Sequence, residues 1–125
     1  MKNNFNIENL MVGDWILYLS DRQENAFPIQ VTAEMFTNEF RTRPHLFDYL
    51  KLTPEMVHGE PTGFGKSLFW LDDNEKFMIK RYEDGTWYFN GESKSPFCTL
   101  ESDFQYVHEL QHMFKMLNFN YNFKI

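Results

Sequence analysis

Residues 76–90, KFMIKRYEDGTWYFN, contain two strand-like runs on either side of Asp84-Gly85. An Asp-Gly pair between such runs is typical of a tight β-hairpin with a two-residue loop. That loop pairs Tyr82 with Trp87 and Lys80 with Phe89. The stretch therefore predicts the centre of an antiparallel sheet, with Tyr82, Trp87 and Phe89 on one face.

Further strands are expected on both sides of this hairpin. Residues 68–71 and 97–100 are apolar runs bounded by turn-forming residues, which indicates an antiparallel meander. Nearer the N-terminus, residues 15–19 and 27–32 have the pattern of a second strand pair around a polar turn. Pro28 cannot donate to a β-ladder, so we expect it at a strand start or a sheet edge. Residues 33–50 carry signals for both helix and strand, and both stay open.

A helix is predicted after the meander. Ser102-Asp103-Phe104-Gln105 has the spacing of a capping box, and apolar residues recur at helical spacing as far as Leu117. From Phe119 to Ile125 the period changes to two, because aromatic and apolar residues alternate with Asn and Lys. This alternation predicts a C-terminal strand or an extended tail.

Length and composition indicate one globular, soluble domain over residues 1–125. The chain has 125 residues, of which 42% are apolar and 24% charged. We therefore predict an α+β fold. Its antiparallel sheet combines an N-terminal hairpin or small-barrel element with the meander, and one C-terminal helix packs on that sheet.

Charge and hydropathy argue against several functions. The 12 Lys and Arg residues against 18 Asp and Glu residues leave a net charge of −6, which disfavours broad nucleic-acid binding. No apolar run approaches the roughly 20 residues that a membrane helix needs. Cys98 is the only cysteine, which favours a reducing compartment and a cytoplasmic location.

One motif points to metal chemistry. His108-Glu109-Leu110-Gln111-His112 matches the H-E-x-x-H pattern, in which two histidines on one helix face bind zinc and the glutamate acts as general base. A zinc-dependent hydrolase would use His108 and His112 as ligands and Glu109 as catalytic base. We expect instead a solvated polar helix face that binds no cofactor, and zinc binding is the alternative.

The zinc hypothesis needs a third protein ligand. Residues 113–125 contain no His, Asp, Glu or Cys, so that ligand would have to come from upstream. The upstream candidates are His45, His58, Cys98 and Asp103, and nothing in the sequence selects one of them.

The aromatic residues suggest binding surfaces. Tyr82, Trp87 and Phe89 are candidates for partner binding or base stacking, although packing in the core of a small sheet explains them more simply. Few basic residues lie near them, which weakens the nucleic-acid alternative. Phe119, Tyr121 and Phe123 are candidates for a strand that adds to a partner sheet or to a second copy, giving a homodimer.

Three blocks of the chain resemble small proteins of gut bacteria and of their phages and mobile elements. Residues 9–15, NLMVGDW, are similar to the opening "LRIGNWV" of that family. Residues 50–55, LKLTPE, followed by Gly63-Phe64, are similar to "IPLTEEWLLKFGF", and residues 106–114, YVHELQHMF, are similar to "YVHQLQNLYF". The resemblance implies no established activity and therefore no catalytic residue.

The resemblance also bears on the H-E-x-x-H motif. The family pattern has Gln and Asn where this chain has Glu109 and His112, so both are local substitutions. Gln111 is shared, and we expect a buried amide that is hydrogen-bonded to the backbone. The family closes its helix with a Thr-Gly-Glu-Glu type stop, whereas residues 118–125 alternate here.

The expected function is a non-enzymatic phage or mobile-element accessory protein that binds another protein. Zinc hydrolysis and single-stranded nucleic-acid binding are the alternatives.

Overall fold

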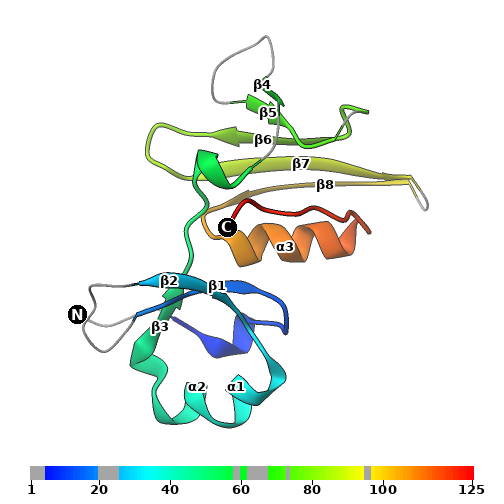
Figure 1. Ribbon diagram of the computed structural model, residues 1–125. Helices are drawn as coiled ribbons and strands as arrows, with labels where there is room; N and C mark the ends of the chain where they lie inside the picture. The colour runs from blue at the N-terminus through cyan, green and yellow to red at the C-terminus, as the bar shows by residue number, and fades with distance from the viewer. Residues whose placement is uncertain (1–4, 20–25, 58–59, 62–67, 73, 95–96) are drawn as a thin grey trace. The chain divides into compact units, whose positions relative to one another are not determined.

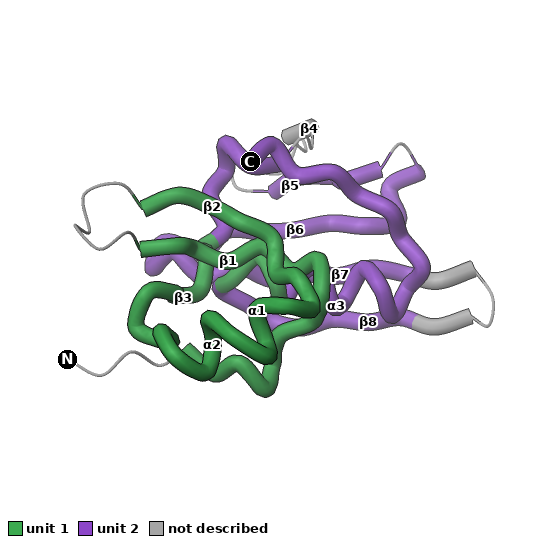
Figure 2. The backbone as a smooth tube through the Cα atoms, turned by 60° about the horizontal axis from the view of Figure 1, so that its bottom comes forward, with its two compact units in different colours: residues 1–51, 106–108 green, residues 52–105, 109–125 purple. Residues whose placement is uncertain are grey.

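The computed structural model describes residues 5–19, 26–57, 60–61, 68–72, 74–94 and 97–125. The predicted α+β fold is confirmed, with two antiparallel sheets and a C-terminal helix. The sequence predicted a single domain, and the chain forms two compact units (Figure 2). Unit 1 comprises Met1–Lys51 and Tyr106–His108, and unit 2 comprises Leu52–Gln105 and Glu109–Ile125.

Unit 1 is built on a three-stranded antiparallel sheet in the order β2-β1-β3. Its elements in chain order are η1 (Ile7–Asn9), β1 (Trp15–Tyr18), β2 (Phe27–Gln30), α1 (Ala33–Thr37), α2 (Glu39–Thr42), η2 (Pro44–Leu46) and β3 (Phe47–Tyr49) (Figure 1). The predicted strand pair is confirmed, and Pro28 lies opposite Leu17 on the edge strand β2. The segment left open, residues 33–50, forms two short helices, a 3-10 turn and a strand.

The core of unit 1 is a cluster of buried apolar side chains from the sheet and the short helices: Leu10, Ile16, Val31, Met35, Phe40, Leu46 and Phe47. Beside it, the fully buried Asp14 accepts a hydrogen bond at Oδ2 from the Met11 N–H at 2.8 Å. This contact closes the turn before β1, in which Gly13 has a φ of +94°, a value that favours glycine.

Unit 2 is built on a five-stranded antiparallel sheet in the order β4-β5-β6-β7-β8. Its elements are η3 (Pro54–Met56), β4 (Glu60–Pro61), β5 (Leu68–Trp70), β6 (Phe77–Arg81), β7 (Trp87–Lys94) and β8 (Phe97–Phe104). Helix α3 (Val107–Met116) follows β8, and its residues from Glu109 onward belong to unit 2. The predicted meander is therefore confirmed.

The hairpin between β6 and β7 has a longer loop than predicted. The Tyr82 N–H donates to the Thr86 carbonyl at 2.8 Å, so the loop contains three residues, 83–85. Gly85 has a φ of +90°, and the Asp84 carboxylate accepts the Thr86 N–H at 2.9 Å. A three-residue loop that ends on such a glycine is the next most common hairpin connection after the two-residue loop.

This loop shifts the strand register by one residue. Trp87 pairs with Arg81 rather than with Tyr82, and Phe89 pairs with Ile79 rather than with Lys80. Because side chains alternate between the two faces of a sheet, a shift by one residue exchanges the faces. The prediction that Tyr82 shares a face with Trp87 and Phe89 is therefore wrong.

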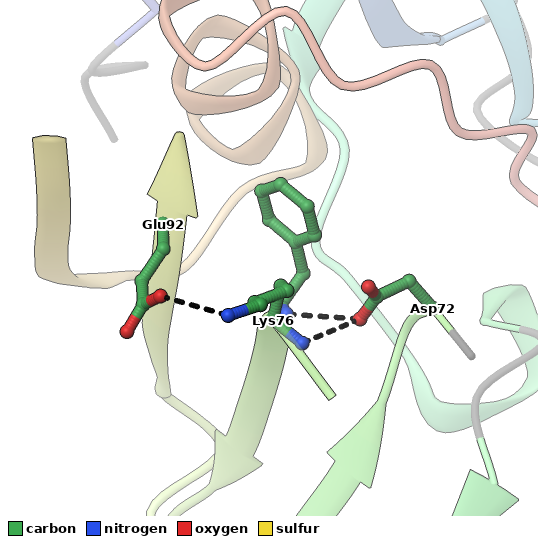
Figure 3. Close-up of polar contacts among 4 residues, drawn as sticks. Asp72, Lys76 and Glu92 are labelled. Carbon is green, nitrogen blue, oxygen red and sulfur yellow. Dashed lines mark hydrogen bonds and ion pairs between the residues drawn. The ribbon is translucent and has the colours of Figure 1, made fainter. Parts of the chain in front are cut away.

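The turn between β5 and β6 is organised by one carboxylate. Oδ1 of Asp72 accepts the backbone N–H groups of Lys76 and Phe77, both at 3.0 Å (Figure 3). The Lys76 ammonium lies 3.4 Å from the Glu92 carboxylate on β7. Both charged groups are exposed, so this ion pair adds little to stability.

The start of the C-terminal helix differs from the prediction. Ser102–Gln105 does not form a capping box, because residues up to Phe104 pair with β7 along the whole of β8. Helix α3 begins at Val107, and the Gln105 N–H donates to the Glu109 carboxylate at 3.0 Å. The helix ends near the predicted position. Asn118 has a φ of +57° there, and the Phe119 N–H donates to the Phe114 carbonyl at 2.9 Å.

Candidate functional site

The structure places His108 in a packed aromatic environment. Its side chain is only 5% exposed, and its ring stacks on Tyr49 with a centroid distance of 4.9 Å and an interplanar angle of 22°. The Tyr106 ring is also nearly parallel to it, at 6.0 Å. All three residues belong to unit 1. The expectation that His108 lies on a solvated helix face is therefore wrong.

Glu109 contacts the start of its own helix. Its carboxylate accepts the Gln105 N–H, and a negative charge in the first turn also interacts favourably with the positive end of the helix dipole. His112 is half-buried one turn further on. No group of three His, Cys, Asp or Glu side chains in the described ranges has the arrangement of a metal site. His58 and the Cys98 side chain lie outside the described residues.

Trp87 and Phe89 belong to the core of unit 2. Both side chains are fully buried, and the Trp87 Nε1–H donates to the Leu52 carbonyl at 3.1 Å. Their role as a partner surface or a base-stacking platform is therefore wrong, because neither ring is accessible. Packing, the alternative that the sequence left open, explains both residues.

The C-terminal segment is not a strand in this structure. Within the described part of the chain, residues 119–125 have no ladder partner. Their addition to a partner sheet or to a second copy stays a prediction. The alternation itself is real, because Phe119, Tyr121 and Phe123 are half-buried while Asn120 and Asn122 are exposed. The segment is extended, as the second of the two sequence interpretations proposed.

The aromatic rings of this segment pack within unit 2. Phe119 stacks on Phe77 of β6 at 4.0 Å, and the rings of Tyr121 and Phe123 lie 5.6 Å and 5.9 Å from Phe114 of α3. The Lys124 N–H donates to the Met56 carbonyl at 2.7 Å. An open groove of about 310 Å³ remains beside the segment, and the half-buried Gln111 lines it. These three aromatic side chains are thus committed to packing inside their own unit.

A different surface of unit 2 gathers polar and aromatic side chains. We call it the outer face, meaning the side of β6–β8 opposite Trp87 and Phe89. The strand register places Lys80, Tyr88 and Asp103 in one row across it, and Met78, Asn90 and Glu101 in the next. The pairing thus brings phenol and carboxylate groups together on neighbouring strands. The outer face carries Met78, Lys80, Tyr82, Tyr88, Asn90, Glu101 and Asp103.

Hydrogen bonds connect the tyrosines of the outer face to the carboxylates of β8. The Tyr88 hydroxyl donates to Glu101 at 2.5 Å, and the Tyr82 hydroxyl donates to Asp103 at 3.4 Å. The Asn90 amide donates to the Tyr88 hydroxyl at 3.4 Å. Each carboxylate can accept further hydrogen bonds, because an ionised carboxylate has about four acceptor positions.

These contacts favour the protonated form of both phenols further. The hydrogen bond to Glu101, together with desolvation, raises the pKa of Tyr88 above its ordinary value. Desolvation and the nearby Asp103 carboxylate raise the pKa of Tyr82. The outer face therefore presents neutral aromatic rings beside acidic side chains. This combination suits cationic groups, which are attracted by aromatic faces and by carboxylates.

The outer face borders an edge strand. β8 has eight residues and is the last strand of the sheet in the described part of the chain. Edge strands can accept an additional strand from another chain. The exposed Glu101 and Asp103 therefore place negative charge on this edge strand.

Comparison with known proteins gave no relative: no family model, curated protein or solved structure matches this chain. In the described residues, no helix is long and apolar enough to cross a membrane. Sequence reasoning did not single out Tyr88 or Glu101, and it considered Asp103 only as a metal ligand and as part of a capping box. The alternation of β7 could have revealed Tyr88, because a residue between two buried aromatics of a strand points to the opposite face.

Proposed function

We propose that this protein is a non-enzymatic accessory protein that binds another protein through the outer face of unit 2. The resemblance to proteins of phages and mobile elements supports an origin in such an element and a role in the cytoplasm of a bacterial host. The partner segment is basic, extended and added along β8. It places lysine or arginine side chains against the tyrosines and carboxylates of the outer face.

The observation that carries this proposal is the pair of tyrosine–carboxylate contacts on and beside the edge strand β8. Tyr88 contacts Glu101 and Tyr82 contacts Asp103, so aromatic rings and carboxylates from the end of β6, from β7 and from β8 lie side by side. Lys80 already shows the type of contact that a partner cation would make, because its ammonium lies 5.7 Å from the Tyr82 ring centroid. The net charge of −6 also favours approach of a basic partner.

Charge also distinguishes a foreign partner from a second copy. If two β8 strands paired antiparallel about Ser102, Glu101 of one copy would lie opposite Asp103 of the other. Like charges directly opposite each other on paired strands are destabilising. A basic strand in the same position would instead pair opposite charges. The proposal therefore favours a heterologous partner over a homodimer through this edge.

A peptide-binding experiment tests the proposal. Purified protein is titrated with peptides in which Lys or Arg alternates with Val or Thr, and with matched peptides that carry Gln or Glu at the charged positions. We expect binding only to the basic series, and we expect it to weaken with added salt because exposed charges are screened. Shifts in backbone amide NMR signals should concentrate on β8.

Charge reversal supplies the matched control. In the double variant Glu101→Lys/Asp103→Lys we expect binding to weaken by about tenfold or more, since two favourable charge contacts become repulsive. Glu55→Lys/Glu83→Lys has the same net charge but changes exposed residues off the outer face. Equal binding to basic and acidic peptides, or an equal loss in both double variants, would contradict the proposal.

A further inference from the structure

Unit 1 contains a hollow that the proposed function does not use. It has a volume of about 320 Å³ and is lined by Tyr18, Ile29, Met35, Glu39, Arg43, Leu46 and Phe47. These residues come from β1, β2, both short helices, η2 and β3, and all of them belong to unit 1. The volume lies at the lower end of the range for small-molecule sites, which is about 300–1,000 Å³.

The inner part of the hollow is apolar. Met35, Leu46 and Phe47 form its buried part, with exposures of 8%, 6% and 2%. Tyr18 and Ile29 are half-buried at its side, and the Tyr18 ring packs against Phe47 at 5.6 Å. An apolar lining favours a hydrophobic ligand group, because burying apolar surface yields roughly 25 cal/mol for each Å².

The rim carries one charge of each sign. Glu39 and Arg43 lie one turn apart around α2, and both are exposed. The Arg43 N–H donates to the Glu39 carbonyl, which fixes the backbone at this position. Neither side chain is ion-paired to any described residue. The Arg43 guanidinium is therefore available to a ligand, and its planar fork matches a carboxylate.

We infer that this hollow binds a small apolar carboxylic acid. Its hydrocarbon part fills the space beside Met35, Leu46 and Phe47, and its carboxylate meets Arg43. Glu39 disfavours a second negative charge, so a monoacid is preferred over a diacid. One water molecule occupies about 30 Å³ in the liquid, so the hollow has the volume of roughly ten water molecules. A ligand that fits inside it has about a dozen non-hydrogen atoms at most.

Phenylpropionate is the probe, and phenylpropionamide is its neutral isostere. Binding is followed by amide NMR shifts in the full chain at low salt. We expect a dissociation constant between about 10 µM and 1 mM for the acid, in line with the efficiency of ligands of this size. The shifts should map to the lining of the hollow, and the amide should bind more weakly.

Two variants with opposite expected effects make the test specific. In Arg43→Gln, we expect the acid to bind about fivefold more weakly, a typical change for one exposed charge contact. In Glu39→Gln, the acid should bind more tightly, because a repulsive charge is removed. Neither variant should change binding of the amide. A general loss of structure could not weaken binding of the acid in Arg43→Gln and strengthen it in Glu39→Gln.

A third variant tests the location. Ile29→Trp adds volume at the half-buried side of the hollow and should abolish binding of both probes while the near-ultraviolet circular dichroism stays native. Any of three results would overturn the inference. The first is that millimolar acid causes no amide NMR shifts in unit 1. The second is equal affinity for acid and amide, and the third is an Arg43→Gln protein that binds the acid as tightly as the unmodified protein does.

Discussion

The two units use the same kind of aromatic-rich sequence in different ways. In unit 2, Phe77, Phe89, Phe114 and Phe119 form a continuous series of ring contacts between the sheet, α3 and the C-terminal segment. In unit 1, rings such as Phe40 and Phe47 pack edge to face at 4.9 Å, but a hollow stays open beside Phe47.

This difference indicates where each unit can bind another molecule. The regular strands of unit 2 direct the large apolar side chains to one face and leave polar groups for the other. The short helices of unit 1 cannot follow a strict period of two, so their side chains leave space beside the sheet. The well-packed sheet therefore offers a polar surface, whereas the less regular unit offers a small apolar hollow.

The strongest test of the packing in unit 2 is truncation after Asn118. This change removes the ring of Phe119 from Phe77 and the rings of Tyr121 and Phe123 from Phe114. We expect the free energy of unfolding to fall by about 4 kcal/mol, since each partly buried aromatic ring contributes roughly 1.5 kcal/mol. Denaturant unfolding measures the change. An unchanged midpoint would show that the segment does not pack on its unit.

Gly91→Ala, a substitution on β7, tests the same packing of aromatic rings on the sheet of unit 2. A Cβ atom on Gly91 would lie 2.6 Å from Phe89, 2.7 Å from Phe77 and 2.9 Å from Leu117. We expect a loss of about 3 kcal/mol, as is typical of overpacking in a dense core. Asn90→Ala, one residue earlier on the outer face, is the control and should change stability much less. Similar losses in both variants would contradict dense packing beneath Gly91.

In unit 1, Asp14→Ala tests a buried polar contact. The substitution removes the carboxylate that accepts the Met11 N–H. We expect a loss of about 2 kcal/mol, within the range for a hydrogen bond to a charged group. Hydrogen exchange should show faster exchange in β1 and β2 than in β6 and β7. Equal acceleration in all four strands would mean that the contact is not specific to unit 1.

Glu109→Gln asks whether this residue supports the helix. It removes the negative charge next to the Gln105 N–H and the helix N-terminus. We expect a loss of about 0.7 kcal/mol, as for other charges in a first helical turn. Glu83→Gln, in the exposed hairpin loop, should be neutral. A fully stable Glu109→Gln protein would remove the structural role assigned to this side chain.

The smallest effect concerns the outer face. The hydrogen bond to Glu101 raises the pKa of Tyr88. This hydrogen bond therefore contributes fully to stability below the unfolded-state pKa of tyrosine, which is near 10. The contribution is lost as pH rises through the higher pKa of Tyr88 in the folded protein. Glu101→Gln should therefore lower the pKa of Tyr88 towards its ordinary value. NMR titration of ¹³C-labelled tyrosine rings measures the shift. An unchanged pKa would contradict the contact.

Much of the fold follows from local patterns. The meander, the N-terminal strand pair and the edge position of Pro28 were predicted correctly, since alternation and turn residues act over short distances. The register of the β6–β7 hairpin was predicted wrongly, because Asp84-Gly85 fits both a two-residue and a three-residue loop. The predicted capping box was also wrong. The eight residue pairs between β7 and β8 stabilise Ser102 in a strand more than its local preference for a helix start can oppose.

The candidate sites were harder to predict. The position of His108 on a helical wheel says nothing about Tyr49, which lies far away in the sequence and packs on it. The tyrosine–carboxylate pairs depend on the register between β7 and β8, which only the folded sheet fixes. The hollow of unit 1 depends on how short helices meet a sheet, and no sequence period describes that.

The chain leaves unit 1 after Lys51 and returns at Tyr106, where these two residues form an antiparallel bridge. Val107, which is fully buried, then donates its N–H to the Leu50 carbonyl at 2.9 Å. Synthesis on the ribosome proceeds from the N-terminus, so the first 51 residues emerge long before the three that complete their unit. Unit 1 therefore receives its last residues, 106–108, only after residues 52–105 of unit 2 have been synthesised.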